Sequence, residues 1–103
     1  MVNPIKQSQV DAIKSYIASN PDRYNKLVIF GKSITEECKN EDFLDVAVQM
    51  TNQKEANDDN ALLDLFCKVD DITDGKFDLV IINCQNNSSN VMNLVNKGEV
   101  IYG

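Results

Sequence analysis

Two strand-like runs, the first of them continuously apolar, flank a glycine and a polar stretch, and this arrangement constrains the fold more than any other feature of the chain. The first run covers residues 27–30 (LVIF) and ends at Gly31, and the second covers residues 44–49. The first run is typical of a strand that is buried on both faces of a sheet. Gly31 predicts a sharp turn, because glycine turns without steric cost. Ser33 stands three residues before Glu36, a capping-box spacing that predicts a short polar helix.

A glycine turn that leads from a strand into a helix suits phosphate binding. Free backbone N–H groups and the positive end of the helix dipole would point at whatever lies above the turn. Asp45, near the start of the second strand, could hold a divalent metal ion against that phosphate. A plain structural turn explains the same pattern, so both interpretations stay open at this point.

The spacing in this stretch resembles the signature of the polymerase β-type nucleotidyltransferase superfamily, in its small form, the minimal nucleotidyltransferases. The family pattern is Gly-Ser, ten residues, then Asp-x-Asp, between two strands. Here Gly31 and Lys32 take the Gly-Ser places, and Phe43-Leu44-Asp45 falls on Asp-x-Asp. The spacing is kept, whereas two of the four signature residues are changed.

Two later segments extend the resemblance over nearly the whole chain. The family places a third carboxylate in a pattern like Val-Asp-Leu-Val, and residues 77–80 (FDLV) match it with Asp78. The family tends to end in a helix, a Gly and an apolar strand with Tyr, which residues 91–102 (VMNLVNKGEVIY) resemble. The resemblance implies an α+β (α/β) fold, a small mixed β-sheet with flanking helices. It also implies a single nucleotidyltransferase-like domain over residues 1–103.

The resemblance also implies a catalytic site. In the family, three carboxylates hold two magnesium ions, which bind the nucleoside triphosphate. Strand residues i and i+2 point to the same side, so both carboxylates of Asp-x-Asp reach one pair of ions. Phe43 cannot ligate a metal, and Asp42 points to the opposite face unless the strand bulges. Asp45 and Asp78 remain as candidate catalytic and metal-binding residues, with Asp42 as a catalytic substitute; alternatively, Asp45 and Asp78 are plain strand-end aspartates.

The candidate nucleotide-binding residues are Gly31, Lys32 and Ser33. Glu36 and Glu37 follow them, and these side chains would repel a triphosphate and compete for the positive end of the helix dipole. Lys32 offers one compensating charge, or it is an ordinary solvated lysine. The residues therefore predict catalysis that is impaired or absent.

Charge and composition narrow the functional classes. The net charge of −6 weighs against unaided binding to nucleic acid and permits a basic protein partner. The chain has no histidine, which excludes the usual serine and cysteine hydrolase arrangements and most zinc enzymes. Metal chemistry would have to use carboxylates, which favours magnesium or manganese. No apolar run approaches the ~20 residues that span a bilayer, so a cytoplasmic location is the default expectation.

Periodicity predicts the remaining elements. Helices are expected over residues 6–19, from about residue 60 to 69, and from 91 to 97. Strands are expected over residues 77–83 and 99–102, and residues 51–59 are expected to form a loop. The side chains expected to face the core from the second and third helices are Leu62, Leu65, Phe66, Val69, Val91, Leu94 and Val95. The three widely spaced cysteines predict free thiols, with Cys67 and Cys84 in the core.

Two main functions fit these features. Minimal nucleotidyltransferases are often antitoxins paired with a HEPN-type ribonuclease toxin, which active members silence by transferring AMP onto it. A degenerate member could still bind and mask such a toxin as its antitoxin. The alternative is an active, Mg-dependent nucleotidyltransferase that moves a nucleotide from ATP to a protein, RNA or small-molecule hydroxyl, with Asp42 brought in by a bulge. A plain dimerising domain or regulatory fragment is a third, weaker hypothesis.

Overall fold

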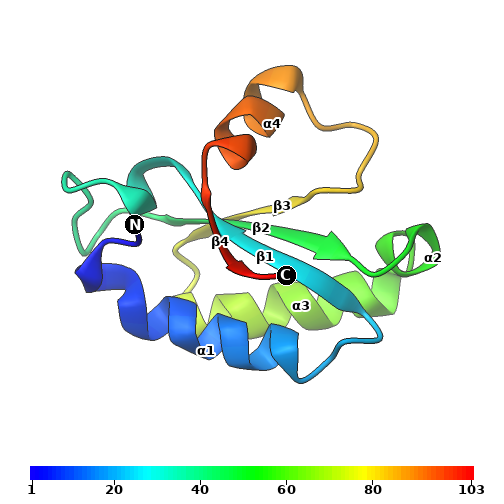
Figure 1. The fold of residues 1–103 in the computed structure, drawn as a ribbon. Coiled ribbons are helices and arrows are strands. Elements are labelled where there is room, and N and C mark those ends of the chain that lie inside the picture. The colour runs from blue at the N-terminus through cyan, green and yellow to red at the C-terminus, as the bar shows by residue number, and fades with distance from the viewer.

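The two apolar runs form the central pair of strands of a mixed sheet. In the computed structural model, which describes all of residues 1–103, β1 (Tyr24–Ile29) pairs antiparallel with β2 (Leu44–Met50). β3 (Phe77–Ile81) lies parallel to β2, and β4 (Glu99–Tyr102) lies antiparallel to β1. The strand order is therefore β3-β2-β1-β4 (Figure 1). The predicted α+β fold with a small mixed sheet and flanking helices is confirmed.

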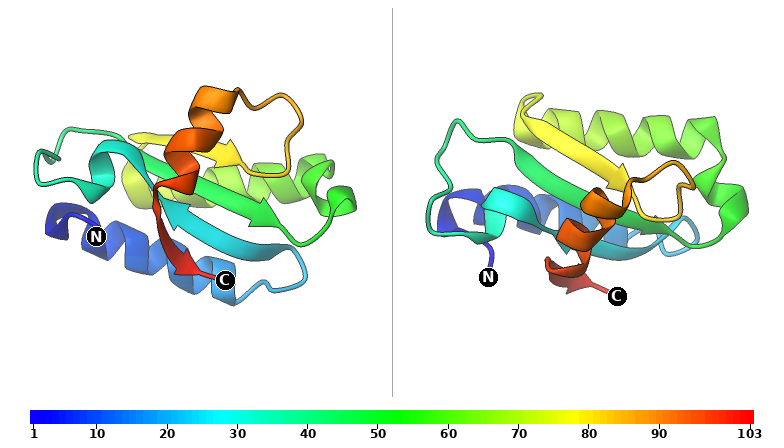
Figure 2. Two further views of the ribbon diagram at one scale, coloured as in Figure 1. Left: turned by 45° about the horizontal axis from the view of Figure 1, so that its top comes forward. Right: turned by 90° about the horizontal axis from the view of Figure 1, so that it is seen from above.

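Helices cover both faces of this sheet. α1 (Gln7–Ala18) and α3 (Asp59–Thr73) lie side by side on one face, and α4 (Ser89–Asn96) lies on the other (Figures 1 and 2). Parallel strands need a crossover connection, and α3 supplies it between β2 and β3. Three short elements complete the chain: the 3₁₀ turns η1 (Pro4–Lys6) and η2 (Gly31–Ile34), and α2 (Gln53–Ala56). No helix is both long enough and apolar enough to cross a membrane.

The sheet has a hydrophobic core on each side. The larger core lies between the sheet and the helices α1 and α3, and its centre is made of side chains with no solvent exposure. These are Val10, Ile13, Ile17, Tyr24, Leu27, Ile29, Leu44, Val46, Val48, Ala61, Leu65 and Val69. The smaller core lies under α4 and contains Val28, Phe30, Ala47 and Val95. β1 and β2 are thus buried on both faces, which the continuous apolar run predicted for β1.

Side chains and two left-handed residues fix the limits of α3. The carboxylate of Asp58 accepts the backbone N–H groups of Asn60 and Ala61, which caps the helix at its start. The helix ends where Asp74 and Gly75 adopt φ values of 55° and 78°, a left-handed turn that sends the chain into β3. The sequence placed the end of this helix four residues too early.

The helix predicted after Gly31 is wrong. Residues Gly31–Ile34 form one 3₁₀ turn, and Thr35 returns to an extended conformation. Ser33 does not form the predicted capping box with Glu36. Its hydroxyl instead bonds to the backbone of Phe43 and Asp45 at the start of β2.

Several predicted core positions are also wrong. Cys67 and Cys84 are exposed, whereas Cys38 is the buried cysteine. Phe66 and Leu94 are each 49% exposed, because each lies beside the buried stripe of its helix and not within it. Residues 51–59 are not a plain loop either, since α2 begins there with Asn52 accepting the N–H of Glu55.

A pair of leucines on α3 tests this description of the core. Leu65 is fully buried and Leu63 is 58% exposed. We expect Leu65→Ala to lower the free energy of unfolding by about 2–5 kcal/mol, because it leaves a cavity in the larger core. The matched change Leu63→Ala should stay within about 0.5 kcal/mol of the wild type. Urea denaturation measures both, and equal costs would contradict the placement of α3.

Candidate functional site

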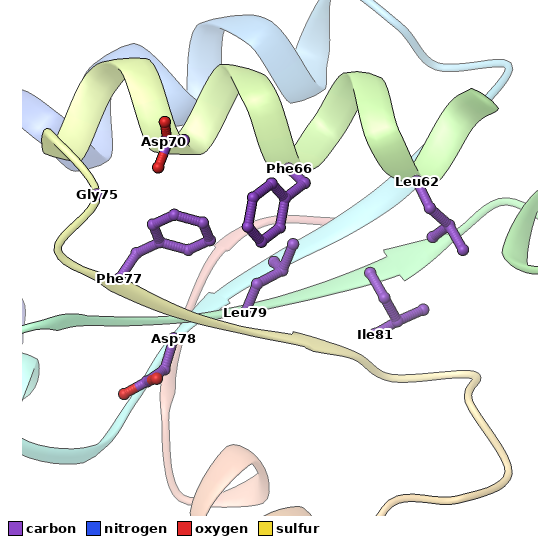
Figure 3. Close-up of a pocket in the computed structure, with 8 residues that line it drawn as sticks. All are labelled: Leu62, Phe66, Asp70, Gly75, Phe77, Asp78, Leu79 and Ile81. Carbon is purple, nitrogen blue, oxygen red and sulfur yellow. The ribbon is translucent and has the colours of Figure 1, made fainter. Parts of the chain in front are cut away.

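Asp45 and Asp78 lie side by side at the start of two parallel strands. They are register partners in the β2–β3 pair, and in-register neighbours on adjacent strands point to the same face. Asp78 is exposed and Asp45 is partly buried. Figure 3 shows the Asp78 side chain directed away from α3, toward the face of the sheet that carries α4. The structure therefore brings these two predicted site residues together.

The glycine turn lies directly against the Asp45 carboxylate. Gly31 has φ +62°, and a Cβ atom at this position would lie 2.6 Å from Oδ2 of Asp45. Both the backbone conformation and the close approach require glycine here. The turn and the Asp45 carboxylate are therefore in contact.

Ser33 is buried and joins the turn to the start of β2. Its Oγ accepts the backbone N–H of Asp45 at 3.1 Å and donates to the carbonyl oxygen of Phe43 at 3.4 Å. The N–H of Phe30 also donates to the carbonyl oxygen of Asp45 at 3.2 Å. The hydroxyl of Ser33 is thus engaged by the protein's own backbone, and its predicted role in nucleotide binding remains a prediction.

The surroundings of Asp45 disfavour its charged form. Burial raises its pKa to about 6, and the neighbouring Asp78 carboxylate adds to this increase. The nearby backbone N–H of Lys32 lowers the pKa only in part. The pair therefore has oxygen donors of the kind that hard cations prefer, together with repulsion that an added cation would relieve.

Asp42 lies apart from this pair, in the turn before β2. Its carboxylate accepts the N–H of Lys39 at 2.8 Å and forms an ion pair with Nζ of Lys32 at 3.2 Å. The bond from Lys39 and the charge of Lys32 hold the pKa of Asp42 below its usual range. β2 begins at Leu44 and pairs with β3 in unbroken register from there. The bulge that would bring Asp42 to Asp45 and Asp78 is not present.

The donor set contains two carboxylates where the predicted signature has three. Phe43, at the place of the first Asp, is 49% exposed and offers no ligand. No group of three or more acidic, cysteine or histidine side chains lies close enough to hold a metal ion. The residues present therefore do not fit a site for two metal ions.

A comparison with known protein families identifies the family of this chain. Residues 11–103 match the family model described as "Polymerase beta, Nucleotidyltransferase". The chain belongs to this nucleotidyltransferase family. The match includes the Gly31 turn, both aspartates and the terminal strand, and it confirms the predicted resemblance. A search of curated proteins finds no match. Polymerase β-type nucleotidyltransferases generally use a divalent metal, which makes the incomplete donor set of this member notable.

Two N-terminal residues that the sequence interpretation missed hold the signature loop of this nucleotidyltransferase. Lys6 is 2% exposed, and its Nζ donates to the carbonyl oxygens of Asn40 and Asp42 at 3.1 and 2.6 Å. Asn3 binds the other side of the loop, where its N–H donates to the carbonyl oxygen of Ser33 at 2.9 Å. The available signal was the position of Lys6 four residues before the buried Val10, which places it on the apolar face of the first helix.

The contact between Gly31 and Asp45 can be measured against Gly75, which also has a positive φ but whose Cβ would meet no atom closer than 3.5 Å. Both glycine-to-alanine changes lower the free energy of unfolding, because alanine disfavours a positive φ. Only Gly31→Ala also displaces the Asp45 carboxylate. We expect Gly31→Ala to cost about 1 kcal/mol more. In an Asp45→Ala background the two costs should become equal in urea denaturation. A persistent difference would contradict the contact.

The raised pKa of Asp45 predicts a specific pH dependence. Its pKa moves from an ordinary 3.8 to about 6 on folding, so between these values the folded state binds more protons than the unfolded state. The free energy of unfolding therefore falls as pH rises through this window. Asp45→Asn should remove this pH dependence. The difference in free energy of unfolding between Asp45→Asn and the wild type should therefore shift in favour of the variant as pH rises through the window, and stay constant above it.

Urea denaturation at pH values across the window measures this advantage. Asp78→Asn serves as the companion variant, because it removes the smaller cause of the raised Asp45 pKa. It should therefore show only part of the pH-dependent gain in free energy of unfolding. An Asp45→Asn advantage that does not change with pH would show that Asp45 titrates normally.

Proposed function

We propose that this polymerase β-type nucleotidyltransferase is impaired in nucleotide transfer and acts by binding a partner protein, in the manner of an antitoxin. The observation that carries the proposal is the pairing of only two carboxylates, Asp45 and Asp78, with Phe43 at the place of the first Asp of the signature. Two carboxylates hold a divalent ion weakly, because most of its oxygen shell must come from elsewhere. Without a firmly held ion, a triphosphate has little to bind to at this site.

The phosphate side of the site supports the same proposal. Lys32 is the one cation of the turn, and its charge is already paired with Asp42. Glu36 and Glu37 follow the turn as exposed side chains, and their charges repel a triphosphate. The 3₁₀ turn is too short to provide the dipole of a full helix. These features weigh against nucleotide binding by Gly31 and Lys32.

Family resemblance supplies the partner class. Minimal nucleotidyltransferases are often paired with a HEPN-type toxin, and masking such a toxin by surface contact requires no catalysis. The net charge of −6 suits a basic ribonuclease surface. A toxin-antitoxin pair of this kind would act in the cytoplasm. The partner assignment rests on analogy within the family, and direct capture of a toxin with the intact chain tests it.

The retained Asp45–Asp78 pair favours one alternative, an active metal-dependent nucleotidyltransferase that uses ATP. In that case Asp42 would have to leave Lys32 and the N–H of Lys39 to complete the site. The acceptor would be a protein, RNA or small-molecule hydroxyl. The two functions predict different effects of changing Phe43.

Restoring the missing carboxylate tests the impaired site. Phe43→Asp places a third carboxylate two residues before Asp45, and its folding cost should be small because Phe43 is half exposed. We expect this variant to bind manganese roughly tenfold or more tightly than the wild type, because affinity rises with ligand charge count. Isothermal titration calorimetry with manganese and ATP measures the difference.

Phe43→Asn is the matched control, since asparagine is polar and close to aspartate in size but adds no charge. It should bind manganese as weakly as the wild type. If the wild type already binds as tightly as Phe43→Asp, and Asp42→Asn abolishes that binding, then Asp42 completes the site and the enzyme alternative holds.

A further inference from the structure

β3 has one free edge. It is the outermost strand of the sheet and pairs only with β2. Two hydrogen bonds mark the ends of the β2–β3 pair. At the start, the N–H of Leu44 donates to the carbonyl oxygen of Lys76, and at the end, the N–H of Ile82 donates to the carbonyl oxygen of Val48. In a parallel pair of strands, the backbone N–H and C=O groups of alternate residues point toward the partner strand. The groups of Asp78 and Val80 therefore point toward β2. Those of the odd-numbered residues 77, 79 and 81 point outward.

The outward groups are open over the first part of the strand. At the far end, Nδ2 of Asn87 donates to the carbonyl oxygen of Ile81 at 2.7 Å and covers that position. No loop or side-chain hydrogen bond reaches the backbone of Phe77 or Leu79. Unpaired strand backbone of this kind is a template for the addition of another strand.

An apolar groove runs along this edge. It lies between α3 and β3 and has a volume of about 450 Å³. Phe66 and Leu62 reach into it from α3, and Phe77, Leu79 and Ile81 face them from β3 (Figure 3). The rings of Phe66 and Phe77 meet edge to face, with their centroids 5.0 Å apart. Phe66 remains half exposed, so the groove can accept a further apolar side chain.

The border of the groove is acidic. Residues 58–74 contain six aspartates and a single lysine. Asp70 lines the groove itself, whereas the Asp78 carboxylate points toward the opposite face of the sheet. Of the six aspartates only Asp64 forms an ion pair, with Arg23. An extended segment that enters the groove therefore meets uncompensated negative charge beside apolar surface. This combination selects basic residues next to apolar ones.

We propose that the free edge of β3 and the adjoining groove bind an extended segment of a basic partner protein. The segment adds a strand beside Phe77 and Leu79, places an apolar side chain against Phe66, and sets Lys or Arg residues near Asp70. This inference rests on the partner-binding role proposed above and names its surface. It is independent of whether any catalysis survives.

A second copy of this chain fits the surface less well. Pairing two β3 edges would bring two acidic α3 helices close together, and their like charges repel. A basic segment relieves the same charge. Sedimentation at rising protein concentration distinguishes the two cases, and a dimer that Phe66→Arg abolishes would overturn the proposal.

The test uses the full chain and a fluorescent synthetic peptide of alternating valine and lysine. Phe66→Arg and Leu63→Arg form a matched pair, because each replaces an exposed apolar residue of α3 by the same cation. Of these two residues, Phe66 lines the groove and Leu63 does not. We expect Phe66→Arg to weaken peptide binding at least about tenfold more than Leu63→Arg does. Thermal unfolding of both variants checks that each is folded.

A second peptide separates strand addition from simple charge attraction. It carries N-methyl groups on the alternate amides that would bond to β3, which keeps its charge and removes the donors. We expect it to bind at least about tenfold more weakly, and we expect the unmodified peptide alone to slow hydrogen exchange at the Leu79 amide. Equal binding of both peptides, or unchanged exchange at Leu79, would overturn the proposal. Toxin capture that survives Phe66→Arg would refute this surface and leave the antitoxin-like role standing.

Discussion

The pairing of β2 on both edges and its burial on both faces set the rest of the structure. β1 and β3 pair with its two edges. Leu44, Val46 and Val48 enter the larger core, and Ala47 enters the smaller one. A slip of one residue would exchange these faces and drive Asp45 into the larger core. The register is therefore fixed by burial, and with it the position of Asp45 beside Asp78.

The same strand explains the groove on the far side of the sheet. Because β3 runs parallel to β2, the chain must cross over through α3. Figure 3 shows the Asp78 side chain directed away from α3, and its register partner Asp45 faces the same side. α3 buries Ala61, Leu65 and Val69 against the sheet. The neighbouring stripe, with Phe66, lies against Phe77 of the edge strand and lines the groove. The carboxylate pair and the groove thus occupy opposite faces of the same edge.

The signature loop is held by contacts that do not depend on a ligand. Ser33 ties the turn to the start of β2, and Gly31 allows the turn to approach Asp45. Lys6 and Asn3 hold the loop from the N-terminal side. These contacts involve backbone groups and would be kept whether position 43 is Asp or Phe. They give a physical reason why this fold tolerates an incomplete donor set.

The sequence predicted β1 well because burial on both faces leaves a continuous apolar run. It predicted the Gly31 turn because few residues adopt a positive φ. It failed at Ser33, where partners ten and twelve residues away replaced the local bond to Glu36. It failed at Cys67 and Phe66, because small differences in helix orientation decide which stripe is buried. The role of Lys6 depends on a loop more than thirty residues away, which no local pattern encodes.

The central claim is that the site no longer holds a metal–nucleotide complex. The most direct measurement is a calorimetric titration of the wild-type chain with manganese and ATP, repeated with Asp45→Asn and Asp78→Asn. The account predicts no saturable binding tighter than about 1 mM, and no difference among the three proteins. A saturable site that requires both aspartates and the nucleotide would contradict the account.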